Sequence, residues 1–223
     1  MTILTFPTLS RTPSGASHRL RGNTQTHRSP LDATTQTLEM PGSVWEFSVR
    51  WQNLPESDWR ILSAFLSELR GRAGRFAFSP AIFAPRRGTG GGVPLLGSNT
   101  PGSSLWIDGW DALAENVMLV GDWLSYQDST GRTRLHMVTQ SVNADEFGQA
   151  LTFITPPVRG PGNIGDPVEV LAPTGVFLLP DDAAPEIEIR PPRLGSVTLT
   201  MVEALVAPAA PGDDGGGPPP PPD

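Results

Sequence analysis

Few side chains in this 223-residue sequence are of the types that usually carry enzyme chemistry. The chain has no Cys and only three His, at positions 18, 27 and 136. Thiol catalysis, disulfides and Cys-ligated zinc are therefore excluded, and the three His are too scattered for a zincin-type pair. A Ser-His-Asp site would depend on one of these His, and no G-x-S-x-G segment supplies a nucleophile. We expect a protein that is not an enzyme and that uses no metal or cofactor.

Two Gly- or Asp-containing stretches could in principle bind a ligand. The GTGGG stretch at 88–92 is rich enough in Gly to cradle a phosphate, but a Walker motif requires Lys, and every basic residue here is Arg. The DGWD stretch at 108–111 lacks the ligand spacing of an EF-hand loop. A carboxylate pair for glycoside hydrolysis stays open, because a sequence does not show distances in space. Most Asp residues nevertheless fall in expected turns.

Tryptophan is well suited to contacts with other molecules. The chain has six Trp, of which Trp45, Trp51 and Trp59 follow strand or helix periodicity toward a core. Trp106 and Trp110 flank a turn instead. We expect these two at a subunit interface or, alternatively, on the sugar-binding surface of a β-sandwich.

Charge is divided unevenly along the chain, whose formal net charge is −7. Residues 1–100 contain 11 Arg and 6 acidic residues, whereas residues 101–223 contain 5 Arg and 17 acidic residues. This polarity suits a molecule that stacks on copies of itself, and equally one that folds with opposite charges facing each other. The overall acidity argues against nucleic-acid binding. Four Arg are expected to form ion pairs with the acidic half of a neighbouring copy: Arg70, Arg72, Arg86 and Arg87.

The spacing of turns predicts a mainly β fold. The chain contains 24 Gly and 25 Pro, and turn signals separate short strands every 8–12 residues or so. The clearest strand is 44–51, with Trp and apolar residues on one face and polar residues on the other. Residues 134–139 and 150–155 are expected to form a hairpin. This pattern is typical of a sandwich or barrel.

One amphipathic helix is expected over about 54–70. Asn53 and Glu56 fit a capping box at its start, and Gly71 is a suitable residue just after its end. Apolar residues recur at helical spacing and define a stripe that faces the core: Trp59, Leu62, Phe65, Leu66 and Leu69.

We divide the chain into three parts. Residues 1–32 form a flexible N-terminal arm, 33–205 a β-rich domain with a long loop at 84–103, and 206–223 a flexible Pro/Gly-rich tail. No apolar run approaches the length of a membrane span, and residues 1–30 lack the apolar stretch of a secretory signal. We therefore expect no membrane contact, and synthesis in a cytoplasm.

Two longer stretches resemble minor tail proteins of long-tailed, siphovirus-type bacteriophages, of the distal tail or tail-tip group. The first is VWEFSVRWQNLPESDWRILSAFLSELRGRAGRFAF, at 44–78. The second, at 119–159, contains G-D-W-L, R-L-H-M-V, A-D-E-F-G and L-T-F-I-T-P-P-V-R segments of a kind that recurs in that group. The resemblance covers about 36–180 and includes no catalytic motif.

The resemblance implies a split barrel or β-sandwich with one helix, and a ring, usually of six copies, between the tail tube and the tip hub. We therefore expect a structural component of the virion tail, assembled in the host bacterial cytoplasm. Its partners would be copies of itself, the tail tube protein and the tip hub protein. The alternatives are a carbohydrate-binding β-sandwich module, a small glycosidase, and another ring-forming tail protein such as a tail terminator. The chain has no obvious appended carbohydrate-binding domain.

Overall fold

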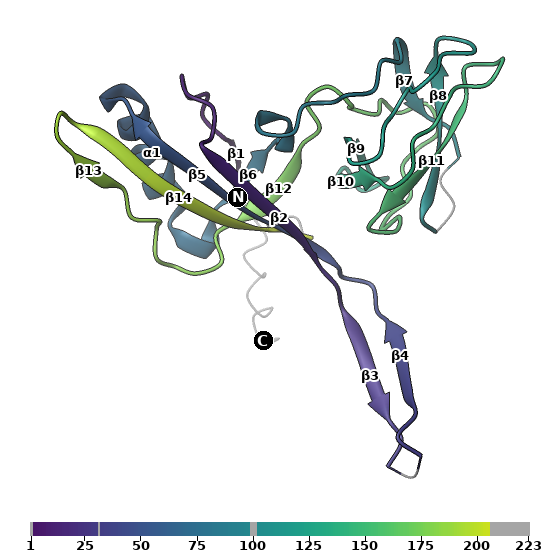
Figure 1. The fold of residues 1–223 in the computed structure, drawn as a ribbon, viewed down its shortest axis with the longest axis horizontal. Coiled ribbons are helices and arrows are strands. Elements are labelled where there is room, and N and C mark those ends of the chain that lie inside the picture. Colours follow the sequence, from purple (N-terminus) through teal and green to yellow (C-terminus); the bar gives the residue numbers. More distant parts are fainter. Residues whose placement is uncertain (1, 31, 99–101, 206–223) are drawn as a thin grey trace, which may run out of the picture.

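The structure, a computed structural model, describes residues 2–30, 32–98 and 102–205. The tail expected at 206–223 lies outside these residues. The described chain forms two β-rich lobes and a two-stranded ribbon that projects away from both (Figure 1). It is mainly β with one α-helix, which confirms the predicted fold class. In the described part of the chain, no helix is long and apolar enough to cross a membrane.

The first lobe is built on a seven-stranded sheet. Its main path runs β1-β6-β12-β14-β5-β2, and β13 pairs with β14 off this path. Only the β1–β6 pair is parallel. The strands are β1 (Ile3–Thr5), β2 (Gly15–Arg21), β5 (Val44–Leu54), β6 (Arg75–Phe78), β12 (Gly175–Leu178), β13 (Glu188–Arg190) and β14 (Leu194–Glu203). The short 3₁₀ turns η1 (Gly71–Ala73) and η2 (Pro80–Ile82) flank β6.

The predicted alternation along β5 is present and builds the first core. Its apolar face is buried, and aromatic rings from several elements gather on it. The Trp45 and Trp123 rings lie 4.7 Å apart, so the core reaches from the first lobe to the start of the second. Burying several rings of this size accounts for much of the apolar area removed from water.

Helix α1 (Glu56–Leu69) packs the predicted stripe against this core, although Trp59 is only partly buried. The expected capping box at the N-terminus is wrong. Pro55 occupies the N-cap position, and Asn53 is still part of β5 with a left-handed φ of 56°. The helix ends at Leu69, with Arg70 as the C-cap at a left-handed φ of 52°, and Gly71 follows it at φ 67°, as expected. The fixed φ of Pro55 is compatible with the extended backbone that leads into the helix.

The second lobe is a five-stranded sheet that nearly closes into a barrel. Its order is β7-β8-β11-β10-β9, and the β10–β11 pair is the predicted hairpin. Isolated bridges Leu95↔Pro167 and Ser125↔Glu169 join one chain segment to both edges of the sheet. This lobe has a core of its own. The strands are β7 (Gly92–Leu96), β8 (Ser104–Trp110), β9 (Trp123–Gln127), β10 (Thr133–Val138) and β11 (Ala150–Thr155).

Two expected segment boundaries differ from the structure. The stretch 84–103, expected as a loop, contains β7. The stretch 1–32, expected as an arm, contributes β1 and β2 to the main sheet, because β2 pairs with β5 over seven residues. The part that projects is the ribbon of β3 (Thr24–Arg28) and β4 (Thr35–Glu39).

Candidate functional site

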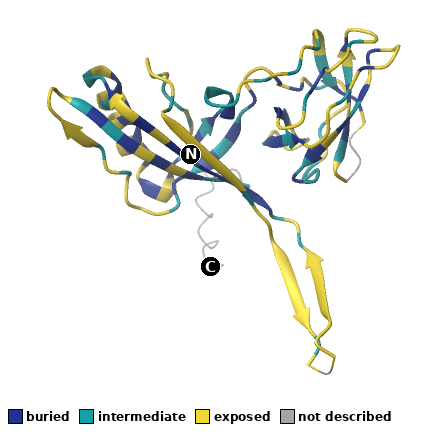
Figure 2. Cartoon of the chain, viewed as in Figure 1, coloured by how far each residue is buried: buried dark blue, intermediate teal, exposed yellow. Residues whose placement is uncertain are grey.

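The ribbon is the most unusual feature of the structure. All ten residues of β3 and β4 are exposed, as Figure 2 shows by their colour. The two strands pair from Thr24↔Glu39 to Arg28↔Thr35. At the far end the Asp32 carboxylate accepts bonds from the backbone and hydroxyl of Thr34, at 3.2 and 2.8 Å. An isolated two-stranded ribbon is marginally stable in water at best, so this one is expected to gain order from a partner.

Sequence reasoning did not find the ribbon, although a signal for it exists. Thr-Gln-Thr occurs at 24–26 and again at 35–37, on either side of a Ser-Pro-Leu-Asp turn at 29–32. Thr is a good strand former, and Pro and Asp favour turns. Because neither segment alternates apolar with polar residues, the hydrophobic pattern by itself does not predict a strand pair here.

The base of the ribbon is held by charge. Arg19 and Arg21, next to each other on one face of β2, both pair with Glu46 of β5. The Arg21 Nη1 to Glu46 Oε1 distance is 2.8 Å. Both Arg side chains stay largely exposed while the carboxylate is mostly covered. The face of β2 near the ribbon therefore carries two Arg side chains for one carboxylate.

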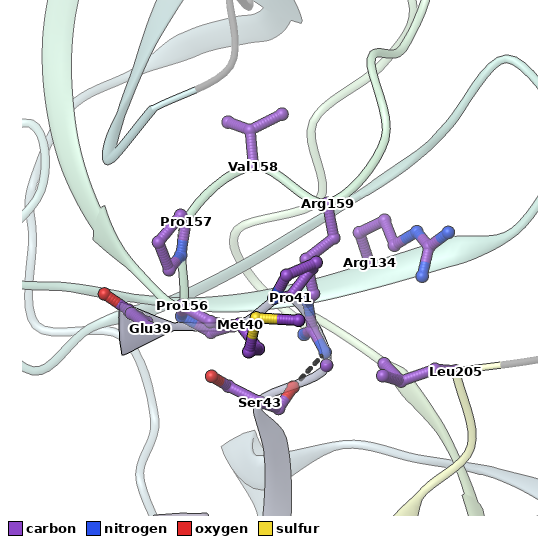
Figure 3. Close-up of a pocket in the computed structure, with 11 residues that line it drawn as sticks. Glu39, Met40, Pro41, Ser43, Arg134, Pro156, Pro157, Val158, Arg159 and Leu205 are labelled. Atoms are coloured by element: carbon purple, nitrogen blue, oxygen red, sulfur yellow. Dashed lines mark hydrogen bonds between the residues drawn. The ribbon is translucent and has the colours of Figure 1, made fainter. Parts of the chain in front are cut away.

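An open pocket of about 620 Å³ lies where the ribbon returns to the body. Met40, Pro41 and Ser43 line one side, and the 156–159 segment of the second lobe lines another (Figure 3). Arg159 extends from that segment and donates through Nη1 to the Ser43 carbonyl oxygen at 2.7 Å. The second lobe is thereby tied directly to the strand that leaves the ribbon.

Arg159 also makes a buried ion pair beside this pocket. Its two terminal nitrogens contact both carboxylate oxygens of Glu203, at 2.8 to 3.1 Å, and the Trp45 backbone N–H donates to the same carboxylate. The two side chains are 8% and 3% exposed. Burial raises the pKa of Glu203, although the charge of Arg159 acts in the opposite direction. The pair therefore links the two lobes at a site with little access to water.

His136 is part of the same buried region. Its ring stacks on Tyr126 with centroids 5.5 Å apart, and its Nδ1 lies 2.8 Å from the Pro156 carbonyl oxygen. Burial lowers the pKa of His136 to about 3 and raises the pKa of Tyr126 to about 12. Both groups are therefore neutral near pH 7. Their stacking is better suited to holding β9 against β10 than to transferring a proton.

The outer edge of β2 is a second open feature of the body. β2 pairs with β5 on one side, and no strand of the described chain pairs with its other edge. A groove of about 570 Å³ runs beside this edge, between β2 and Ile82, Phe83 and Ala84. The His18 ring in this groove lies 5.4 Å from the Trp123 ring, and burial lowers the pKa of His18. The groove has a mixed lining, in which Ile82 and Phe83 are the large apolar side chains. An open edge next to such a groove is a surface to which an extended strand can add.

The structure does not bring the four predicted interface Arg together. Arg70 is exposed at the end of α1, and Arg72 in η1 donates through Nε to the Pro180 carbonyl oxygen at 2.7 Å. Arg86 donates to the Gly90 and Val117 carbonyl oxygens, and Arg87 contacts the Val120 carbonyl oxygen and, at 3.8 Å, the Asp122 carboxylate. Arg72, Arg86 and Arg87 thus make contacts within one chain, and each of the three contacts at least one residue of the acidic half.

The two predicted interface Trp lie in different environments. Trp106 is 41% exposed on the outer face of β8. Trp110 is buried, and the Arg86 guanidinium lies 5.1 Å from its ring centroid. Of the pair, Trp106 is the side chain open to a partner.

Two comparisons with known proteins returned no similarity. No protein-family profile matches the chain, and no curated protein sequence matches it.

Proposed function

We propose that the protein is a structural component of a bacteriophage tail tip, where it forms a ring, of about six copies, between the tail tube and the tip hub. The observation that carries the proposal is the ribbon, which offers ten exposed strand residues and two unpaired edges to a neighbour. The open edge of β2 is a matching acceptor. Ring interfaces are heterologous, so each copy must give one surface and receive another.

The resemblance of 44–78 and 119–159 to minor tail proteins agrees with this proposal, in which the chain acts by assembly and without catalysis. A tail terminator would use the same features and is the nearest alternative.

Light scattering combined with negative-stain images tests the proposal. We expect a species near six times 23.8 kDa that shows closed rings. A variant in which 24–39 is replaced by a short Gly-Ser turn should remain folded and monomeric. A wild-type chain that stays monomeric at high concentration would contradict the proposal.

A carbohydrate-binding module is the second candidate, and Trp106 is the observation that favours it. This ring lies on the outer face of the second lobe, diagonal to the partly exposed Phe153 across β8 and β11. Aromatic side chains on a flat sheet face can stack on sugar rings. Trp fluorescence titrated with cell-surface polysaccharide tests this function, with Trp106→Ala as the control; no response in the wild type would exclude it.

A further inference from the structure

We propose that β4 of one copy adds as an extra strand to the open edge of β2 in a second copy. Leu38 would then enter the groove beside Phe83, and Glu39 would lie over Arg19 and Arg21. The inference rests on the proposed function, since it names the contact through which neighbouring copies join. In this contact the ribbon of one copy supplies the added strand, and the unpaired edge of β2 in the second copy receives it.

The acceptor edge has two chemically different faces. Ala16 and His18 pair with Val49 and Phe47, so they lie on the side of the sheet that carries the aromatic core and the groove. Arg19 pairs with Glu46 and lies on the opposite side, as does Arg21 two residues further on. A strand that adds to this edge therefore meets the Ile82 and Phe83 side of the groove on one face and the two Arg side chains on the other.

Strand β4 carries the complementary pattern. Leu38 is the one large apolar side chain in β3 and β4, and it is 60% exposed. Glu39 is its neighbour and therefore points to the opposite face. A register that puts Leu38 on the groove side also puts Glu39 on the arginine side. A slip of one residue would reverse both matches at once, so the two faces together select the register.

Strand β3 does not fit this edge as well. It carries His27 and Arg28 and has neither an apolar nor an acidic side chain. Arg28 would meet Arg19 and Arg21 on one face of β2, and like charges in adjacent strands are destabilising. On the other face it would place a guanidinium against Ile82 and Phe83, which is also unfavourable.

Crosslinking between two versions of the chain tests the inference, because the natural chain has no Cys. One tagged version carries Ser17→Cys in β2, and an untagged version carries Thr37→Cys in β4. The matched control replaces Thr37→Cys by Thr26→Cys, since Thr26 pairs with Thr37 at the same height in the ribbon. With a short thiol-reactive linker, we expect several-fold more crosslinked heterodimer from the 17–37 pair than from the 17–26 pair.

Three crosslinking results would overturn the inference. Equal yields from the two pairs would mean that β4 is not selected. A dominant product between two Ser17→Cys chains would mean that β2 pairs with β2. If ribbon deletion abolishes assembly but position 17 links to neither strand, the proposed function survives and this acceptor site is wrong.

A second variant tests the apolar contact without a linker. Leu38→Asp should weaken self-association roughly tenfold or more, because burial of a Leu side chain is lost and a charge enters the groove. Leu171→Asp is the control, since Leu171 is 71% exposed on the second lobe. Equal effects of the two substitutions on the light-scattering mass would contradict the role of Leu38.

Discussion

Replacement of Arg159 by Met should destabilise the protein by about 3–5 kcal/mol at pH 7, the range expected when one partner of a buried ion pair is removed. The structure supports the upper part of this range. The Glu203 carboxylate is 3% exposed and receives both Arg159 nitrogens, so the variant leaves a buried carboxylate with the Trp45 backbone N–H as its remaining donor. The Ser43 carbonyl oxygen loses its bond as well. In a chain of this size such a loss lowers Tm by roughly 10 °C.

The stability lost in the Arg159→Met variant should depend on pH in a defined direction. Because the pKa of Glu203 is raised, the folded state holds this proton more tightly than the unfolded state. The group's contribution to stability is therefore greatest below the ordinary value of 4.5 and declines as pH rises through the raised pKa. Removal of the Arg159 charge raises that pKa further. The difference in unfolding free energy between wild type and variant should therefore shrink as pH falls from about 7 to 5.

Urea denaturation followed by Trp fluorescence measures these free energies. The decisive control is the double variant Arg159→Met/Glu203→Leu, which removes both charges; buried pairs replaced by apolar residues are often neutral or stabilising. We expect the double variant to lie close to wild type, so that the coupling energy in the cycle is at least about 3 kcal/mol. A single variant that costs less than about 1 kcal/mol, or additive single losses, would refute the interpretation of this pair as a buried clamp.

Two further predictions concern the second lobe. Because the pKa of His136 is about 3, its ring NMR signals should not titrate between about pH 8 and 5. The unfolded chain binds a proton at His136 below the ordinary pKa of 6.5, so the free energy of unfolding should fall as pH drops from 6.5 toward 3. The His136→Gln variant should lose less stability over this pH range in urea titrations. An unchanged loss would argue against buried, neutral His136 as a cause of the acid sensitivity. Gly148→Ala should cost at least about 3 kcal/mol, because φ is 75° and a Cβ would lie 2.2 Å from the Trp110 carbonyl oxygen. Gly131→Ala, at φ 76° with no atom within 4 Å, should cost only about 1 kcal/mol, and equal melting shifts would contradict this distinction.

Most of the elements that build the cores could be predicted from hydrophobic periodicity. An element that buries one face must carry apolar residues at the spacing of that strand or helix. The β5 face, the α1 stripe and the β10–β11 hairpin each follow from side chains within one or two elements. The division into two lobes could not be predicted, since it depends on which distant segments pair. β2 shows this well: its sequence GASHRLR has little alternation, and its strand conformation comes from pairing with β5.

The candidate site was harder to predict, because interface chemistry leaves no fixed motif. Arg86 was expected at a surface between copies, yet two backbone carbonyl oxygens and the Trp110 ring hold it within one chain. Arg has the same side-chain chemistry in both roles, and only the fold decides between them. Trp110 was taken for an interface residue for a similar reason. Simple alternation along β8 would place it on the outer face with Trp106, but Gly109 with φ of 82° interrupts the alternation and Trp110 is buried.

The route of the chain through the ribbon gives the molecule a mechanical property. The long strand β5 begins a few residues after β4 ends, and it lies between β14 and the edge strand β2 of the main sheet. Backbone hydrogen bonds in antiparallel sheets are perpendicular to the strands. Because β2 leads into β3 and β4 leads into β5, tension along the ribbon pulls β2 and β5 in the same direction. Such tension shears the bonds between β5 and β14 together and does not unzip them one after another. A pull from an attached neighbour would be resisted by the central sheet as a unit.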